Sequence, residues 1–381
     1  MQKILLFIAS LFYFNFLFSK NEIKSWQGIH ETPLSRLEQQ FADPPVEFAN
    51  HVIWGWEGKM DKKTICNDLD SIKKKGFRAI IFEAGYKLPF KYLSEEWFKA
   101  IRTGVLEAKK RGMKVWIIDE GKYPSGFAGG KFSQERPDLR MQALVIGDTI
   151  QIKRGEVMTN HKIAPEIISA VAVSTSGAPN RTVAINNGEI SFNAGLDDWK
   201  ILLVKSDFRT AVTRAVNNPN GGKDATNSLC DYLNPVAVQQ FIDWTHEQYK
   251  KYLGKELGTT VLGFRGDEPD YAHLPWTPSI VQTFKDTKGY DPTPYLASFF
   301  TTSPTIQEQR VKADYWDVWS SLFATHFFKL QADWCAANGV AHITHLNKEH
   351  EMPACVKAEG DYFRNLSKVQ IPGVDAIWNQ I

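Results

Sequence analysis

The feature that most constrains the fold is an alternation of short apolar runs and helical patterns in the first third of the chain. Apolar runs lie at residues 51–56, 78–84 and 114–120, and helical patterns lie between them at residues 60–75 and 95–111. A spacing of about 30 residues is typical of strand–helix–strand units, whose strands lie parallel in one sheet. The sequence therefore predicts an α/β protein with a parallel sheet.

The same rhythm returns in the second half, after a loop at residues 217–227. The pattern there predicts further helices and three more strands, at 234–257, 260–264, 278–287, 310–338, 340–345 and 373–378, in chain order. A (β/α)8 barrel needs eight strands to close its hydrogen-bond ladder. About six strands are predicted here. We therefore expect an incomplete TIM-type (β/α)8 barrel in a shortened version of a longer enzyme, and the alternative is that two further strands lie elsewhere in the chain.

The segment between these halves has no helical pattern. It holds short runs rich in β-formers, separated by Gly and Asn turns, at 144–146, 149–152, 170–173, 182–185 and 201–204. We interpret it as a small β-rich insertion after the third strand. The predicted organisation is a signal peptide at 1–20, the first half of the barrel at 21–138, the insertion at 139–215 and the rest of the barrel at 216–381.

The first residues resemble an export signal. One Lys precedes an apolar run from Ile4 to Phe18, and polar residues 19–21 follow. A run of about 15 residues is short for a bilayer span, so a secretory signal peptide is the preferred interpretation and an uncleaved anchor is the alternative. We expect a secreted or periplasmic protein with no stable membrane insertion after cleavage.

Charge and cysteine content exclude several classes. Lys and Arg number 45 and Asp and Glu number 43, so the chain lacks the basic excess of proteins that bind nucleic acids. None of Cys66, Cys230, Cys335 and Cys355 has a zinc-like spacing. Helical patterns predict that Cys66 and Cys335 are buried apolar residues, and a disulfide stays open.

Acidic residues follow nearly every predicted strand. The carboxyl ends of parallel strands share one edge of the sheet, where α/β proteins gather functional groups. A ring of acids there suits glycoside hydrolysis or metal binding, although a single such acid is usually a solvated loop residue. The strand-end acids are Glu57, Glu83, Asp119, Glu120, Asp267, Glu268, Glu349 and Asp375.

The segment FRGDEPDY gives the sharpest catalytic candidate. An apolar strand leads directly into the pair Asp267–Glu268 within a turn bounded by Gly and Pro. Glycosidic cleavage needs a protonated carboxyl that donates to the leaving oxygen and a second carboxylate opposite. Glu268 is the predicted general acid; the alternative is a structural acid that caps the turn or pairs with Arg265. Glu349 and Glu359 are the candidates for the second carboxylate.

Other side chains near the strand ends are candidate substrate ligands. His345 and Asn347 alternate at one strand end as sugar-hydroxyl ligands would, although His345 and His350 could instead hold a metal. Aromatic rings there could stack on a sugar, with core packing as the alternative. We interpret the Gly-rich residues 124–130 as a flexible active-site loop. The predicted substrate-binding set is Trp54, Trp56, Glu83, Glu120, Tyr123, Asp267, His345, Asn347, Asp361, Asp375 and Trp378.

Seven motifs together carry a family resemblance. HVIWGWEG, IIDEGKYPSGFAGG, DYLNP, FRGDEPDY, THLNKEH, EGDYFR and VQIPGVDAIW occur in this order from about residue 45 to the end. In order and spacing they resemble bacterial glycoside hydrolases of family 106, the α-L-rhamnosidases. The resemblance implies a (β/α)8 catalytic barrel with appended β-sandwich domains. It further implies inverting hydrolysis by two glutamates, often with a calcium ion near the substrate.

Carried over to this chain, the family's acid is Glu268 and its partner is Glu349 or Glu359. Glu349 is preferred because it lies closer to a strand end. The expected function is inverting hydrolysis of terminal α-L-rhamnosyl or related residues from oligo- or polysaccharides of plant or microbial origin. A cofactor is not required by the residues themselves, and Ca2+ enters only through the resemblance. Two alternatives are a truncated, non-catalytic carbohydrate-binding remnant and a metal-dependent hydrolase.

Overall fold

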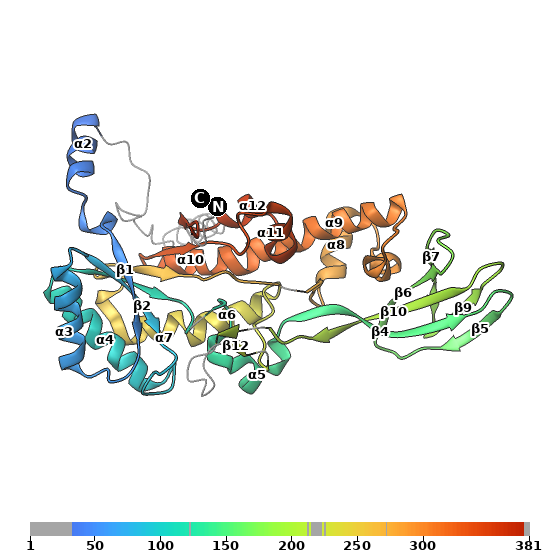
Figure 1. The fold of residues 1–381 in the computed structure, drawn as a ribbon, viewed down its shortest axis with the longest axis horizontal. Coiled ribbons are helices and arrows are strands. Elements are labelled where there is room, and N and C mark those ends of the chain that lie inside the picture. The colour runs from blue at the N-terminus through green and yellow to red at the C-terminus, as the bar shows by residue number, and fades with distance from the viewer. Residues whose placement is uncertain are drawn as a thin grey trace, which may run out of the picture.

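The computed structural model describes residues 33–121, 123–211, 213–214, 223–224, 226–271 and 273–376. The predicted signal peptide and Trp378 lie outside these ranges. Figure 1 shows an elongated molecule in which a parallel sheet with its helices forms one end and a long antiparallel sheet forms the other. No helix within the described ranges is long and apolar enough to cross a membrane.

The parallel sheet has six strands in the order β1-β2-β3-β13-β15-β16. All neighbouring strands pair parallel, so the predicted α/β class with a parallel sheet is confirmed. The strands are β1 His51–Trp56, β2 Ala79–Ala84, β3 Lys114–Ile118, β13 Val261–Arg265, β15 Ala341–Thr344 and β16 Ile371–Pro372.

The prediction of the sixth strand at residues 373–378 is wrong. The strand that pairs with β15 is the two-residue β16, and residues 373–376 have no strand structure. The amide of Gly373 donates to Thr344 O across 2.7 Å, and a Cβ at Gly373 would lie only 2.9 Å from that oxygen. Within the described ranges β16 does not pair with β1, so the sheet is open and a complete barrel is not shown.

Helices flank the parallel sheet, and side-chain caps define several of their first turns. The Asp61 carboxylate accepts the amide of Thr64, and Thr305 forms a capping box with Glu308. The predicted helix at 234–257 is divided at Thr245, and the predicted helix at 310–338 contains a π-helical segment. The main helices are α3 Lys62–Lys74, α4 Glu95–Lys110, α6 Pro235–Trp244, α7 His246–Leu253, α8 Ile280–Lys288, α9 Ile306–Phe323 and α10 Lys329–Ala337, with the π segment at Ala324–Phe328.

The β-rich segment between β3 and β13 forms antiparallel sheets that project away from the parallel sheet (Figure 1). Its longest strand is one continuous element where two short runs were predicted, because a bulge at Gly147, opposite the step from Leu203 to Val204, lets the strand continue through the break in the pattern. The large sheet has the order β14-β4-β10-β6-β7 and a smaller one the order β5-β9-β8. These strands are β4 Gln142–Ile152, β5 Val157–Lys162, β6 Ile167–Ser174, β7 Arg181–Thr182, β8 Ile185–Asn186, β9 Glu189–Asn193, β10 Trp199–Phe208 and β14 Pro275–Trp276, and the pair β11 Thr213–Arg214 and β12 Lys223–Asp224 stands apart.

An aromatic core joins β1 and β2 to the helices that cover them. Trp54 and Trp56 contact each other edge to face, with ring centroids 5.3 Å apart, and both contact Phe82. Trp56 is fully buried and Trp54 is 8% exposed. The structure shows the core-packing alternative for these two rings, because burial leaves little of either ring open to a sugar.

The four cysteines are free. Cys335 is buried as predicted, whereas Cys66 is only partly buried.

Candidate active site

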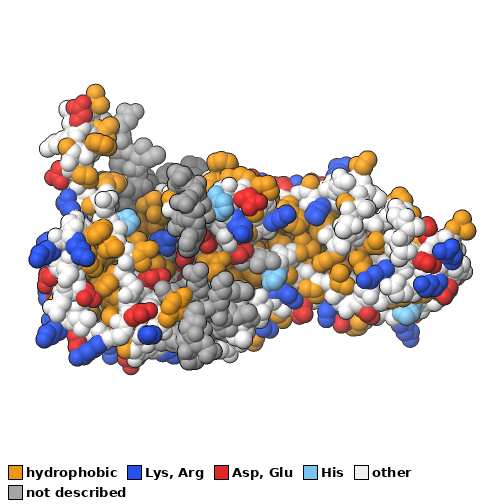
Figure 2. Space-filling view, viewed as in Figure 1, with side chains coloured by type: hydrophobic (Ala, Val, Ile, Leu, Met, Phe, Trp, Pro, Cys, Tyr) orange, Lys and Arg blue, Asp and Glu red, His pale blue; other side chains and the backbone are white. Residues whose placement is uncertain are grey.

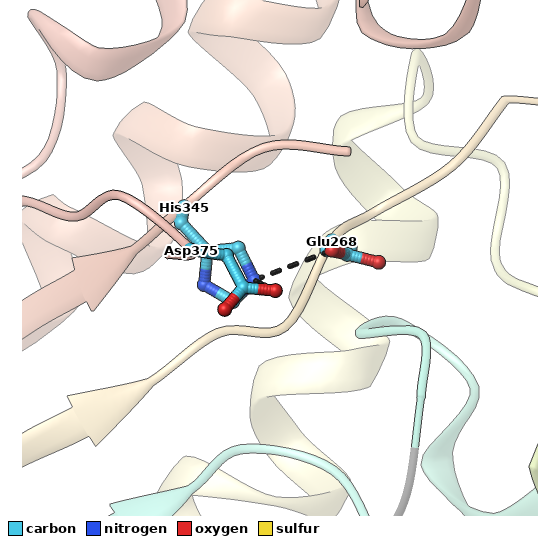
Figure 3. A group of neighbouring side chains, drawn as sticks. All are labelled: Glu268, His345 and Asp375. Atoms are coloured by element: carbon cyan, nitrogen blue, oxygen red, sulfur yellow. Dashed lines mark ion pairs between the residues drawn. The ribbon is translucent and has the colours of Figure 1, made fainter. Parts of the chain in front are cut away.

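Three strand ends deliver one side chain each to a common point at the carboxyl edge of the parallel sheet. Glu268 follows β13, His345 follows β15 and Asp375 follows β16 (Figure 3). The Nε2 atom of His345 lies 3.5 Å from Glu268 Oε1 and 3.9 Å from Asp375 Oδ2. It also lies 3.4 Å from Asp267 Oδ1. The parallel topology thus gathers residues that are far apart in the chain, as the strand-end acids predicted.

The turn after β13 holds Glu268 in an unusual backbone conformation. Its φ angle is +38°, a left-handed value that is rare for a residue other than glycine. Arg265 pairs with Asp267, Nη1 to Oδ1 across 3.7 Å. Arg265 is therefore the ion-pair partner of Asp267, and the alternative in which it pairs with Glu268 is wrong. The Glu268 side chain is partly exposed and faces the cluster.

Asn347 connects the loop after β15 to three neighbouring groups. Its side-chain amide donates to Tyr123 OH across 3.1 Å and to Asp270 Oδ2 across 3.2 Å. Its backbone amide donates to Glu359 Oε1 across 2.6 Å. Tyr123 and Asn347, both predicted as substrate ligands, therefore lie together with the second carboxylate candidate.

Glu359 ends helix α11, Met352–Glu359, and is fully buried. Burial raises the pKa of its carboxyl well above the usual value, and the charges of Asp270, Glu268 and Glu349 raise it further. Its Oε2 atom has no hydrogen-bond partner among the described residues. Glu359 therefore lies within the electrostatic field of Glu268 and has one buried oxygen without a hydrogen-bond partner among the described residues.

Glu349, the other candidate for the second carboxylate, has different hydrogen-bond partners from Glu359. Its Oε1 accepts the backbone amide of Asp375, and its Oε2 accepts that of Leu346 across 3.4 Å. Both oxygens thus bind backbone groups, so that the carboxylate ties the segment after β16 to the end of β15. This position suits a group that orients Asp375 toward His345.

The cluster of Glu268, His345 and Asp375 has three potential ligand atoms within 4.8 Å of one another. Calcium binds six to eight oxygens and does not use imidazole, so this donor set does not fit the ion that the resemblance implies. Arg265 Nη2 lies 3.4 Å from His345 Nδ1. Because a guanidinium can only donate, Nδ1 must be the acceptor and the neutral ring carries its proton on Nε2. The nitrogen that faces the carboxylates then has no lone pair for a transition metal either.

Glu120 supports a loop, which corrects its predicted role as a substrate ligand. Its side chain is 1% exposed and accepts the backbone amides of Gly121, Ala128 and Gly129, the first and last across 2.7 and 3.0 Å. Desolvation raises the pKa of this carboxyl to about 8. The Gly-rich residues 124–130, predicted to be a flexible loop, are instead largely buried and fixed by these bonds.

Two other predicted ligands lie apart from the cluster. Asp361 is an exposed residue whose carboxylate accepts the amide of Arg364 across 2.8 Å, and it thereby caps helix α12, Tyr362–Leu366. Asp361 is therefore a helix cap and not, as predicted, a substrate ligand. Glu83 is a partly buried residue of β2, two strands away from β13.

Asp119 was expected among the strand-end acids but without a role, and Ser125 was not singled out; the structure joins the two by a hydrogen bond. Asp119 is fully buried at the end of β3 and accepts the hydroxyl of Ser125 across 2.7 Å. Desolvation raises the pKa of Asp119 to about 7. The position of Asp119 beside Glu120 at a strand end was a usable signal, whereas a lone serine in a Gly-rich segment carries none. Asp270, in the GDEPDY segment, was likewise not singled out.

The parallel sheet is open, and carboxylates line the edge at which its strands end. The chain is therefore an α/β protein that carries its functional groups at strand ends. A model of the α-L-rhamnosidase family, glycoside hydrolase family 106, matches residues 162–380. Because that match covers more than half of the 381 residues, the chain belongs to this glycoside hydrolase family.

Two known proteins are similar to the chain. A putative beta-glucuronidase of Formosa agariphila is 23% identical over 363 residues, which cover 81% of this chain and 30% of that protein. The structure of a rhamnosidase from Novosphingobium sp. PP1Y matches with a TM-score of 0.63 at 14% identity, over 89% of this chain and 49% of the other. The second likeness concerns the fold alone. The chain spans less than half of the length of each.

Proposed function

We propose that this chain carries the catalytic edge of a glycoside hydrolase that removes terminal α-L-rhamnosyl residues by an inverting mechanism with two carboxyl groups. The observation that supports it best is the convergence of Glu268 and Glu359 on one edge of the sheet, where the charge of Glu268 helps to raise the pKa of Glu359. The raised pKa makes the ionised Glu359 carboxylate a stronger base toward water, and two neighbouring carboxyl groups are what an inverting hydrolase requires.

We assign the second carboxylate to Glu359 in preference to Glu349, which the sequence favoured. Glu349 uses both of its oxygens to bind backbone amides. Glu359 has one oxygen without a partner among the described residues. A general base needs such an oxygen in order to take a proton from water.

The solvent exposure of the two glutamates distinguishes the general acid from the general base. Glu268 is partly exposed, and Glu359 is fully buried. In an enzyme that removes a terminal sugar, the leaving group lies toward solvent and the attacking water lies beneath the sugar. Glu268 therefore suits the general acid, and Glu359 suits the base. The His345 Nε2 proton faces Glu268 and helps to orient its carboxyl group.

The charge of the site favours a neutral sugar over a uronic acid. Among the described residues, Arg265 is the cation in contact with the carboxylate cluster, and it is already engaged by Asp267 and His345. A glucuronide would bring another carboxylate into the field of these acids without a free cation to bind it. Glucuronide hydrolysis, suggested by the name of one relative, is therefore the second candidate.

The test compares 4-nitrophenyl α-L-rhamnopyranoside with 4-nitrophenyl β-D-glucuronide. We expect hydrolysis of the aryl rhamnoside by the wild type. On an α-L-rhamnosyl disaccharide, whose leaving alcohol needs a proton, kcat should fall about 10²- to 10⁴-fold in Glu268→Gln. The matched control is Glu57→Gln, at the exposed end of β1, which should leave the rate unchanged. Proton NMR of the first released sugar anomer tests inversion. Rhamnose binding without turnover would instead identify a carbohydrate-binding protein, and turnover of the glucuronide alone would establish the second candidate.

The proposed location is outside the cytoplasmic membrane, because the N-terminal sequence resembles a secretory signal and the substrates would be oligo- or polysaccharides. Fractionation of cells that express the natural gene, with detection by antibody, tests this proposal. Retention of the first 20 residues in the mature protein would contradict it.

A further inference from the structure

Ser125 makes an unusual set of contacts between the loop after β3 and the turn after β13. Its hydroxyl donates to Asp119 Oδ1 and accepts the backbone amide of Asp267, each across 2.7 Å. Its own amide donates to Asp267 O across 2.8 Å. Ser125 thus binds both backbone hydrogen-bonding groups of Asp267, the N–H and the C=O. Asp267 directly precedes Glu268.

Ser125 is itself firmly placed. It is fully buried, and its carbonyl accepts the Tyr232 hydroxyl across 2.6 Å. The Glu120 carboxylate fixes the same loop through three backbone amides. A buried, fully bonded hydroxyl is costly to remove, because its partners would lose their hydrogen bonds without gaining water.

The turn is also held from its other side. The amide of Gly266 donates to Ile343 O across 2.8 Å, and a Cβ at Gly266 would lie only 2.9 Å from Thr344 Oγ1. Gly266 and Asp267 are therefore both fixed immediately before Glu268. A left-handed φ at a non-glycine residue is unfavourable and persists only where the surroundings impose it.

From these contacts we infer that Ser125 is a positioning residue, which imposes the left-handed backbone of Glu268 and so directs its carboxyl group toward His345. The inference rests on the proposed function for its kinetic consequence. Its structural part stands independently, because the hydrogen bonds to Asp267 exist whatever the substrate is.

The kinetic test is Ser125→Ala, assayed on an α-L-rhamnosyl disaccharide, whose leaving alcohol needs a proton from the general acid. Misplacement of a catalytic group by about 1 Å reduces rates up to about 10²-fold. We therefore expect kcat to fall about 10- to 100-fold, while KM changes little because the substrate contacts remain. Ser125→Thr, which keeps the hydroxyl, should recover kcat.

The matched control is Ser169→Ala. Ser169 is also a buried serine, and its hydroxyl accepts the amide of Ala297 across 3.0 Å in the antiparallel sheet. Its loss should reduce stability as the loss of Ser125 does, with kcat unchanged. An equal fall of kcat in both variants would overturn the inference, because the effect would then be general destabilisation.

Amide hydrogen exchange separates this inference from the proposed function. In the wild-type protein the Asp267 amide should exchange slowly, and in Ser125→Ala it should exchange at least about tenfold faster. If the wild type hydrolyses no rhamnoside but shows this pattern, the proposed function fails and the positioning role stands. Fast exchange of Asp267 in the wild type overturns the inference, even if the Ala variant does not fold.

Discussion

The backbone amide of Asn347 donates to the Glu359 carboxylate across 2.6 Å, and this bond links the loop after β15 to the end of α11. It places a buried carboxyl group beside the three strand ends that carry Glu268, His345 and Asp375. The face of the molecule shown in Figure 2 carries basic and acidic side chains interspersed, without a basic stripe.

Replacement of Glu359 should therefore have a greater effect than replacement of Glu349. We expect Glu359→Gln to lower kcat about 10²- to 10⁴-fold, because an amide cannot act as the base. Glu349→Gln should cause a smaller loss, since an amide oxygen can still accept a backbone hydrogen bond. Steady-state kinetics on the aryl rhamnoside measure both. The reverse order of effects would return the role of base to Glu349.

The acidic limb of the pH–rate profile should lie above the ordinary pKa of a glutamate. The pKa of Glu359 is raised by burial and by Asp270, so a base at this position loses its charge at a higher pH than an ordinary glutamate does. Asp270→Asn removes one negative charge and should move the limb to lower pH, by about one pH unit. Measurement of kcat/KM against pH checks this. A limb that stays in place would show that Asp270 does not influence the base.

Truncation of Trp56 should affect stability rather than substrate affinity. The ring is fully buried and packs on Phe82 and Trp97. Trp56→Ala should lower the free energy of unfolding by about 3–5 kcal/mol, as measured by urea denaturation. The KM of the folded fraction should be unchanged. A large rise in KM at little cost in stability would restore the sugar-stacking role predicted from the sequence.

Stability should also depend on pH through Asp231. This carboxyl is buried, accepts Thr277 Oγ1 across 2.7 Å, and has its pKa raised by desolvation to about 7 from an ordinary value of 3.8. A folded-state pKa above the unfolded one stabilises the fold below pH 3.8, and the contribution is lost as pH rises through 7.

Between pH 3.8 and about 7 we therefore expect Asp231 to lower the free energy of unfolding by at most about 1.4 kcal/mol per pH unit. Asp231→Asn should flatten the decline. Exchange of the exposed Asp148 for Asn serves as the control and should leave the slope unchanged. Urea denaturation at a series of pH values measures the slope, and an unaltered slope in Asp231→Asn would contradict the assignment.

The sequence alone determined the parallel α/β class and the five longer strands of the sheet. A buried parallel strand needs a continuous apolar run, and the helix between two such strands needs its own periodicity, so both signals are local. The carboxyl ends of parallel strands share one edge, which is why Glu268 and His345 could be expected to meet before their distance was known.

Only the tertiary structure decided which of these groups face the cluster of Glu268, His345 and Asp375. Trp56 and Glu120 are buried, although both lie at or just after the end of a strand, as Glu268 does. The roles of Ser125 and Glu359 depend on hydrogen bonds across 142 and 12 positions of the chain. Such contacts follow from how the loops pack over the sheet, and no periodicity or short motif encodes them.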